Sequence, residues 1–170
     1  KGSRLGKYTK NNTKCMLNVH GKTLLERAID ALLEANIKDF ILVLGYKGDN
    51  VKKYIEENEL DKKINIKYVY NEVYDTTNNI YSLYLARDYL AKDDTILLES
   101  DLIYDTTIIK KLVNSEYESA ALIAKYEEWM DGTVVKLNDD NTINSFVERK
   151  DFNYDEVDNY YKTVNIYKFS

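Results

Sequence analysis

The sequence contains no proline and only one cysteine, one histidine and one tryptophan. Because Cys15 has no second cysteine to pair with, an internal disulfide is excluded and a reducing compartment is favoured. His20 alone supports neither a histidine-based metal cluster nor a Ser-His-Asp triad. No apolar run approaches the roughly 18 residues of a membrane span, and no segment has the pattern of a signal peptide. We therefore expect a cytoplasmic protein with no membrane partner.

The charge balance is moderately acidic. The chain has 24 basic and 29 acidic residues and a formal net charge of −5 at pH 7, which argues against a dedicated nucleic-acid-binding protein. Hydrophobic residues make up 44% and charged residues 31% of the sequence, as is ordinary for a globular protein. A length of 170 residues suits one domain over residues 1–170.

Segments with helical and strand-like periodicity alternate along the chain. Apolar residues recur at helical spacing over residues 23–35, 49–58, 80–90 and 107–113. Apolar runs typical of strands cover residues 39–46, 64–70, 95–99, 119–125 and 163–169. From Thr133 the period changes, and a turn at residues 138–141 predicts a β-hairpin. This order predicts an α/β protein with three layers, a mostly parallel sheet and an appended β-hairpin.

The N-terminal segment has the composition of a polyphosphate-binding site. A basic loop that starts at Gly2 contains Ser3 and Arg4, and a further lysine follows at Lys14. Small residues let backbone N–H groups approach phosphate oxygens, while Arg and Lys supply the opposing charge. We therefore interpret Gly2, Ser3, Arg4 and Lys14 as nucleotide-binding residues.

The order of these residues resembles the signature G-x-G-[ST]-R-[LM]…P-K-x-[LM]…G-K-x-[LI] of the nucleotidyltransferase superfamily that makes sugar and alcohol nucleotides. The sequence departs from it in two ways: Thr13 stands where the signature has proline, and the apolar strand that precedes this loop in the family does not precede Gly2. The resemblance implies a Rossmann-like nucleotidyltransferase fold with its first strand missing. We therefore expect the chain to be a fragment of a longer polypeptide.

Asp101 follows the apolar run 95–99, at the end of a strand where open α/β sheets bind ligands. A carboxylate there can hold Mg²⁺ against nucleotide phosphates. The alternative is a helix N-cap or turn aspartate. The last Asp of the matching acidic cluster binds the metal in the superfamily, so the resemblance implies Mg²⁺ at Asp101, with a second acidic ligand beyond Ser170.

Four small polar residues, at positions 76–79, lie at the start of a predicted helix, and of this stretch Thr77, Asn78, Asn79 and Ser82 are the candidate nucleotide-binding residues. Their amide and hydroxyl groups can pair with the polar edge of a pyrimidine; the alternative is a capping motif without a ligand. The stretch Asn-Asn-x-Tyr-Ser-Leu-Tyr-Leu from Asn78 resembles the base-binding turn of bacterial CTP:phosphocholine and CTP:2-aminoethylphosphonate cytidylyltransferases. This resemblance implies CTP as the nucleotide.

Candidate acceptor-binding residues lie nearer the C-terminus. The ring of Trp129 and the carboxylate of Asp131 suit a cationic head group, the alternative being a core tryptophan beside a turn aspartate. Glu148 and Arg149 occupy the place of a Phe-x-Glu-Lys-Pro segment in the sugar enzymes that the sequence resembles, and Asn165 falls on the glycine of their last substrate strand. The combined pattern is most similar to the 2-aminoethylphosphonate enzymes, over essentially all 170 residues.

The sequence therefore predicts Mg-dependent transfer of CMP from CTP to a small phosphonate or phosphate, with 2-aminoethylphosphonate favoured and pyrophosphate released. Arg4, Lys14 and Asp101 are the predicted catalytic residues. Phosphocholine and sugar 1-phosphates are alternative acceptors, and a nucleotide-binding domain without turnover is an alternative of a different class. Beyond CTP and the acceptor, the candidate partners are a fused aminotransferase domain or a second copy of the chain.

Overall fold

The computed structural model describes residues 12–170 of the chain. Its helices are α1 (Leu24–Glu34), α2 (Gly48–Glu57), α3 (Asn79–Leu85), α4 (Arg87–Leu90) and α5 (Thr107–Val113). Its strands are β1 (Asn18–Val19), β2 (Lys22–Thr23), β3 (Asp39–Leu44), β4 (Asn65–Tyr70), β5 (Thr95–Leu98), β6 (Ala120–Lys125), β7 (Val134–Leu137), β8 (Ile143–Val147) and β9 (Tyr161–Phe169). Short 3₁₀ segments cover Lys14–Met16, Leu60–Lys62, Arg149–Asp151 and Tyr154–Asn159.

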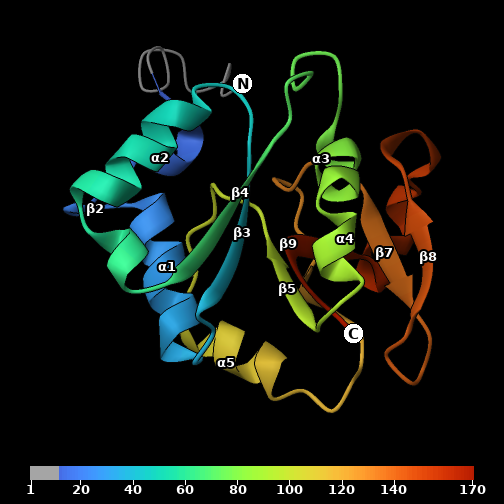
Figure 1. The fold of residues 1–170 in the computed structure, drawn as a ribbon. Helices are drawn as coiled ribbons and strands as arrows, with labels where there is room; N and C mark the ends of the chain where they lie inside the picture. Colours follow the sequence, from blue (N-terminus) through green and yellow to red (C-terminus); the bar gives the residue numbers. More distant parts are fainter. Residues whose placement is uncertain (1–11) are drawn as a thin grey trace.

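These elements form the expected α/β layers. Helices α1 and α2 lie on one side of the β3–β4 pair, and α3 and α4 lie on the other (Figure 1). The segments that leave β3, β4 and β5 emerge on the same side of the molecule, which is the upper side in Figure 1. Within residues 12–170, no helix combines the length and the hydropathy that a membrane crossing requires.

The strands pair differently from the expected mostly parallel sheet. The pair β3–β4 is parallel, whereas β5, β6 and β7 each pair with β9 in antiparallel orientation, and β7 and β8 form the predicted hairpin. The pairings within residues 12–170 are therefore mixed, with one parallel pair. The chain leaves β6, makes the hairpin and returns in the reverse direction as β9 between β5 and β6. Periodicity reports which residues form a strand but not the strand's neighbours or direction.

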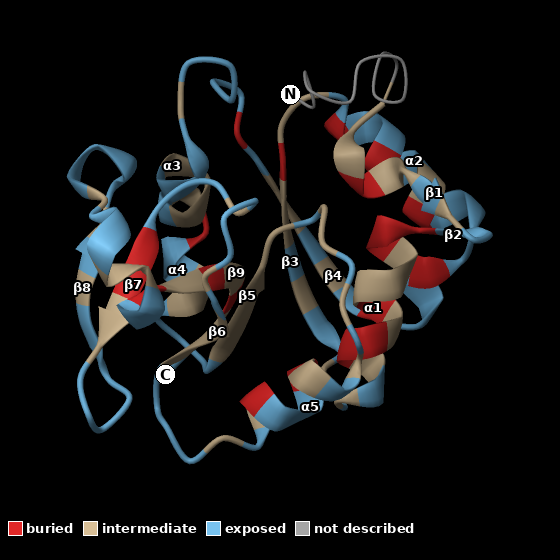
Figure 2. Cartoon of the chain, turned by 180° about the vertical axis from the view of Figure 1, so that it is seen from behind, coloured by how far each residue is buried: buried red, intermediate tan, exposed pale blue. Residues whose placement is uncertain are grey.

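Helix α1 joins two hydrophobic clusters. Leu25 and Ile29 pack in a cluster with α2 and β3, while Leu32 packs in a second cluster with Ile109 of α5 and Ile166 of β9. The buried residues in Figure 2 are concentrated accordingly on α1 and α2, with further ones on α5. The amphipathic period of residues 23–35 predicts this helix because it faces apolar neighbours along its whole length.

A capping box starts helix α1. The hydroxyl oxygen of Thr23 accepts a hydrogen bond from the Glu26 backbone N–H at 3.2 Å, and the Glu26 carboxylate accepts one from the Thr23 backbone N–H at 2.8 Å. Two backbone donors that the helix itself leaves unpaired are thereby satisfied. The cap fixes the start of α1, and with it the connection from Lys14 into the core.

The helix expected over residues 80–90 is divided at Ala86. This residue is 5% exposed, and its backbone N–H bonds to the carbonyl of Leu83 rather than continuing a regular α-helical turn. No residue of α3 is buried, so the small Ala86 provides the close contact between this helical segment and the rest of the protein. Asn79, Ile80 and Tyr84 of α3 are consequently exposed.

Candidate functional site

Lys14 and Asp101 form an ion pair beyond the end of β5. The Lys14 Nζ atom donates a hydrogen bond to Asp101 Oδ2 at 2.6 Å. The two side chains are 40% and 27% exposed, so both groups remain accessible to a ligand. A partly exposed pair contributes at most about 1 kcal/mol, which interactions with an anionic ligand or a metal ion can offset. The structure thus brings two of the predicted catalytic residues together.

The cysteine that follows Lys14 is unsuited to nucleophilic chemistry. Cys15 is 7% exposed within the cluster shared by α1 and α2, and its Sγ lies 2.9 Å from the hydroxyl oxygen of Thr13. Burial raises the pKa of the Cys15 thiol, and the hydrogen bond with Thr13 only partly opposes this. The thiol therefore stays protonated at neutral pH and packs as a small hydrophobic side chain in the core.

Asn71 organises the loop between β4 and α3, and sequence analysis did not identify it. The residue is 3% exposed, and its Nδ2 atom donates to the hydroxyls of Thr77 and Ser82, each at 3.1 Å. Its Oδ1 atom accepts the backbone N–H of Val73, and its own backbone N–H donates to the carbonyl of Leu44. A polar residue directly after an apolar strand, as at Asp101, was the available signal. Asn71 fixes two of the predicted nucleotide-binding residues.

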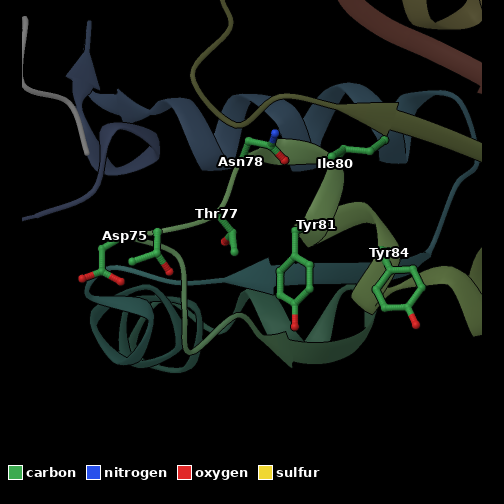
Figure 3. Close-up of a pocket in the computed structure, with 7 residues that line it drawn as sticks. Asp75, Thr77, Asn78, Ile80, Tyr81 and Tyr84 are labelled. Carbon is green, nitrogen blue, oxygen red and sulfur yellow. The ribbon is translucent and has the colours of Figure 1, made fainter.

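An open cleft of about 660 Å³ lies along the same loop. Its volume is within the range of small-molecule sites, about 300–1,000 Å³. Asn78 is the N-cap residue of α3 but its side chain makes no capping hydrogen bond, so the capping alternative does not account for its amide. The residues that line the cleft are Asp75, Thr76, Thr77, Asn78, Ile80, Tyr81 and Tyr84 (Figure 3).

Aromatic rings form one wall of this cleft. The rings of Tyr81 and Tyr84 stack with centroids 6.1 Å apart and an interplanar angle of 30° (Figure 3). The guanidinium of Arg87 lies 4.2 Å from the centroid of the Tyr84 ring. Polar groups at Thr77 and Asn78 therefore stand beside apolar ring faces, a combination suited to a planar heterocycle.

Three of the four predicted base-binding residues make hydrogen bonds within the protein. The Thr77 hydroxyl accepts from Asn71 and donates to the carbonyl of Val73 at 2.8 Å. The Ser82 hydroxyl accepts from Asn71, and the Asn79 Nδ2 atom donates to Glu99 Oε1 at 2.8 Å. Glu99 Oε2 in turn accepts from the Nδ2 atom of Asn165 at 3.0 Å. Asn165, predicted to contact the acceptor, has a left-handed backbone with φ of 59°, which explains why it falls on a glycine position. Glu99 was not predicted as a functional residue.

The remaining predicted acceptor residues gather in the loop after β6 and at the end of β8. Trp129 is 76% exposed, which makes the alternative of a core tryptophan wrong, and its indole N–H donates to Glu127 at 2.6 Å.

Asp131 and Arg149 form an ion pair with each other, while Glu148 pairs with Lys150 at 3.0 Å. Asp131 also accepts the backbone N–H of Gly132 at 2.9 Å. This part of the surface combines an exposed aromatic ring with carboxylates, two of which are paired with the cations of Arg149 and Lys150.

Three predicted phosphate-binding residues, Gly2, Ser3 and Arg4, lie outside the described residues. Within residues 12–170 there is no group of three or more His, Cys, Asp or Glu side chains that could hold a metal ion. Mg²⁺ commonly uses only one or two carboxylates, with substrate phosphates and water completing its shell. The single carboxylate of Asp101, accessible and beyond a strand end, fits that requirement.

The arrangement can bind a phosphorylated heterocycle. The cleft offers ring faces with a polar edge, and Lys14 offers a cation close to a carboxylate that suits a hard metal ion. The carboxyl ends of strands in α/β sheets are the usual place for such ligands. The geometry therefore supports phosphate chemistry at this edge.

The comparisons with known proteins agree with that interpretation. The sequence profile of the MobA-like NTP transferase domain matches residues 1–137. A CTP:phosphoglutamine cytidylyltransferase from Campylobacter jejuni is 29% identical over 182 residues, covering 99% of this chain and 69% of the relative. A CMP-5'-(3-aminopropyl)phosphonate synthase from Streptomyces rubellomurinus is 28% identical over 167 residues, covering 98% of this chain and 26% of the relative.

A choline-phosphate cytidylyltransferase from Haemophilus influenzae is 29% identical over 143 residues, covering 81% of this chain and 58% of the relative. The chain thus spans between 26% and 69% of the length of these relatives. Among solved structures, an apo UDP-glucose pyrophosphorylase matches with a TM-score of 0.80 at 17% identity, covering 99% of this chain and 72% of that chain. This likeness shows a shared nucleotidyltransferase fold.

Proposed function

The chain belongs to the family of MobA-like NTP transferase domains, and on this premise we propose that it transfers CMP from CTP to a small phosphate or phosphonate, releasing pyrophosphate. The observation that carries the proposal is the contact of 2.6 Å between Lys14 and Asp101, a cation suited to phosphate and a carboxylate suited to a metal ion. The open cleft lined by residues between Asp75 and Tyr84 is the proposed place for the base. The names of three relatives, which all describe formation of a cytidine nucleotide product, support CTP as the donor.

In the proposed complex the cytosine base occupies the cleft, where Thr77 and Asn78 face its polar edge and Tyr81 contacts its ring. The triphosphate extends toward Lys14, which neutralises charge at the α-phosphate and the departing pyrophosphate. Arg4 is proposed to share this role. Asp101 would hold Mg²⁺, which when bound supplies positive charge to the phosphate oxygens.

An acceptor oxygen attacks the α-phosphorus in line with the leaving pyrophosphate. A phosphate or phosphonate oxygen is already anionic at neutral pH, so the reaction requires no general base from the protein. Catalysis then depends on how the protein orients the two substrates and on how well Lys14 offsets the charge that develops. The cost of bringing two anions together explains why cationic side chains are needed at this position.

The acceptor is proposed to carry a cationic group, with 2-aminoethylphosphonate as the leading candidate. Trp129 is 76% exposed, so its ring face is accessible to an ammonium group, and the carboxylate of Glu127 accepts its indole N–H. Phosphocholine is the second candidate, supported by the choline-phosphate relative. A sugar 1-phosphate lacks the cation that this loop suits, and the nucleotide-binding domain without turnover is the alternative to be tested first.

A pyrophosphate-release assay tests the proposal. CTP, UTP, ATP and GTP are each combined with 2-aminoethylphosphonate, phosphocholine or glucose 1-phosphate in the presence of Mg²⁺. We expect release with CTP and one of the first two acceptors. CTP binding by calorimetry without release under any combination would favour the non-catalytic alternative, and release with UTP or with glucose 1-phosphate alone would contradict the proposed specificity.

A further inference from the structure

Glu99 connects two segments that belong to opposite halves of the candidate site. One carboxylate oxygen, Oε1, accepts the amide of Asn79 at 2.8 Å, and the other, Oε2, accepts the amide of Asn165 at 3.0 Å. Asn79 is the first residue of α3, next to the cleft, and Asn165 lies within β9. One side chain therefore touches both the segment proposed for the base and the strand predicted for the acceptor.

The contacts of Glu99 suit a residue that holds two segments at a fixed separation rather than one that neutralises a positive charge. Within residues 12–170, both hydrogen bonds to its carboxylate come from neutral side-chain amides. The backbone repeats the connection, since the Glu99 N–H donates to the carbonyl of Asn165 at 3.3 Å. Asp101, two positions along the chain, instead contacts the cation of Lys14. The two neighbouring carboxylates thus have different environments.

The backbone of Asn165 makes this connection informative. Its φ of 59° is left-handed, a conformation that costs most residues free energy and that asparagine tolerates better than others. The residue is partly buried, and its amide points to Glu99 rather than to its own backbone. A residue in such a conformation persists where surrounding contacts stabilise it, and the hydrogen bond to Glu99 is one such contact.

We propose that Glu99 is a positioning residue that sets the separation between the base-binding turn and the acceptor strand. It acts through Asn79 on one side and through Asn165 on the other. The hydrogen bonds of Glu99 do not depend on the proposed function, but the assignment of Asn79 to CTP binding and of Asn165 to acceptor binding rests on it. The inference assigns to Glu99 no contact with a substrate or a metal ion.

Kinetics with paired variants test two arms separately: the contact of Glu99 with Asn79 and its contact with Asn165. Glu99→Ala is expected to raise the KM for CTP and the KM for the acceptor by about tenfold each, the loss of one hydrogen bond to a charged group per arm. Asn79→Ala should raise only the KM for CTP. Asn165→Gly, which keeps the left-handed backbone, should raise only the KM for the acceptor. Equal effects of all three variants on both KM values would overturn the proposal.

A conservative variant separates positioning from charge. In Glu99→Gln the amide oxygen can accept from Asn79 while the amide N–H₂ donates to the oxygen of a flipped Asn165, so both arms survive. We expect both KM values to stay within about threefold of the wild type. If Glu99→Gln loses as much as Glu99→Ala, the negative charge is what matters and the positioning role is refuted. Glu116→Ala, an exposed acidic residue, controls for loss of charge.

Hydrogen–deuterium exchange without substrates keeps this inference separate from the proposed function. Residues 76–82 and 163–167 should exchange faster in Glu99→Ala and at the wild-type rate in Glu99→Gln. Asn79→Ala should speed exchange in residues 76–82 alone and Asn165→Gly in residues 163–167 alone, which provides the test if Glu99→Ala does not fold. Unchanged exchange of either segment in the alanine variant would overturn the bridge, even for a protein that turns over no nucleotide.

Discussion

The ammonium group of Lys14 lies 2.6 Å from the carboxylate of Asp101, although 87 positions separate the two residues in the sequence. The contact joins the segment before α1 to the segment after β5. Both side chains are partly exposed, so a lysine of the kind that binds phosphate and a carboxylate of the kind that binds divalent cations are accessible at one place. Binding of a metal nucleotide would exchange this contact for two new ones.

Removal of either member of the pair should strongly reduce turnover. We expect Lys14→Met and Asp101→Asn each to lower kcat/KM by about a hundredfold, the usual effect of deleting one electrostatic group that acts on the transition state. The measurement is pyrophosphate release at saturating Mg²⁺, with folding checked by circular dichroism. Turnover within a few-fold of wild type in either variant would contradict the assignment.

The chain offers a matched control for those variants. Lys22 and Asp30 also form a Lys–Asp contact of 2.6 Å, but on the exposed face beside α1. Lys22→Met and Asp30→Asn change the same charges in the same kind of pair. We expect both to retain wild-type kcat/KM, because an exposed pair contributes little and lies away from the cleft.

Asn71 should affect both stability and nucleotide binding. Asn71→Ala leaves the Val73 N–H without its buried acceptor and releases Thr77 and Ser82, so we expect a loss of about 1–3 kcal/mol in the free energy of unfolding. The KM for CTP should rise while the KM for the acceptor changes less. Urea unfolding and steady-state kinetics measure the two effects. Asn144→Ala, which removes an exposed hydrogen bond of the β7–β8 hairpin, should show neither.

Trp129 should determine the affinity for the acceptor. Trp129→Ala is expected to raise the KM for a cationic acceptor by about tenfold with no change in the KM for CTP, since a cation over an exposed ring contributes about 0.5–1 kcal/mol and more when partly desolvated. Trp129→Tyr should retain most of the affinity. Phe146→Ala deletes another exposed ring, on β8, and is expected to have no effect. An equal effect of both alanine variants would indicate a general loss of surface packing.

Glu26 should make part of the stability depend on pH. Burial raises the pKa of its carboxyl, but hydrogen bonds from Thr23 and Tyr54 outweigh burial and hold the pKa below its usual value. Because the folded pKa is lower than the unfolded one, ionised Glu26 stabilises the protein at neutral pH, and this contribution is lost as the pH falls through the folded pKa.

The variant Glu26→Gln tests that sign. We expect it to lower the Tm at neutral pH and to differ progressively less from the wild type as the pH falls through the folded pKa of the Glu26 carboxyl. Thermal unfolding followed by circular dichroism over this range provides the comparison. Glu116→Gln removes an equal charge at an exposed position and serves as the reference; a constant Tm difference for Glu26→Gln at every pH would refute the linkage.

The helices and strands were predictable where their signal is local. The helix over residues 107–113 has the bounds of α5, and α1 lies within the predicted 23–35, since amphipathic period and capping residues are read from neighbouring positions. The sheet pairing was not predictable in the same way, because β9 enters between β5 and β6 after a long excursion through the hairpin. Such neighbours depend on tertiary contacts rather than on periodicity.

The residues of the candidate site show the same difference between local signals and tertiary contacts. Lys14 and Asp101 could be predicted from residue type and from position after a strand, and the structure brings them into contact. Asn71 follows a strand, which was a usable signal, but its hydrogen bonds to Thr77 and Ser82 could not be predicted from that position. Glu99 was missed because its partner Asn165 is 66 positions away in the sequence. Residue chemistry therefore identified candidate ligand-binding groups, whereas the groups that hold them in place required coordinates.

The left-handed backbone of Asn165 has a consequence for how this position tolerates change. Glycine would relax the main chain but has no amide, aspartate would repel the neighbouring carboxylate, and branched side chains could not adopt the conformation without cost. In a saturation library at position 165, ranked by turnover, few variants should accordingly remain active, with asparagine most active and glycine second. Low mutational tolerance would then occur at a site that carries no reacting group.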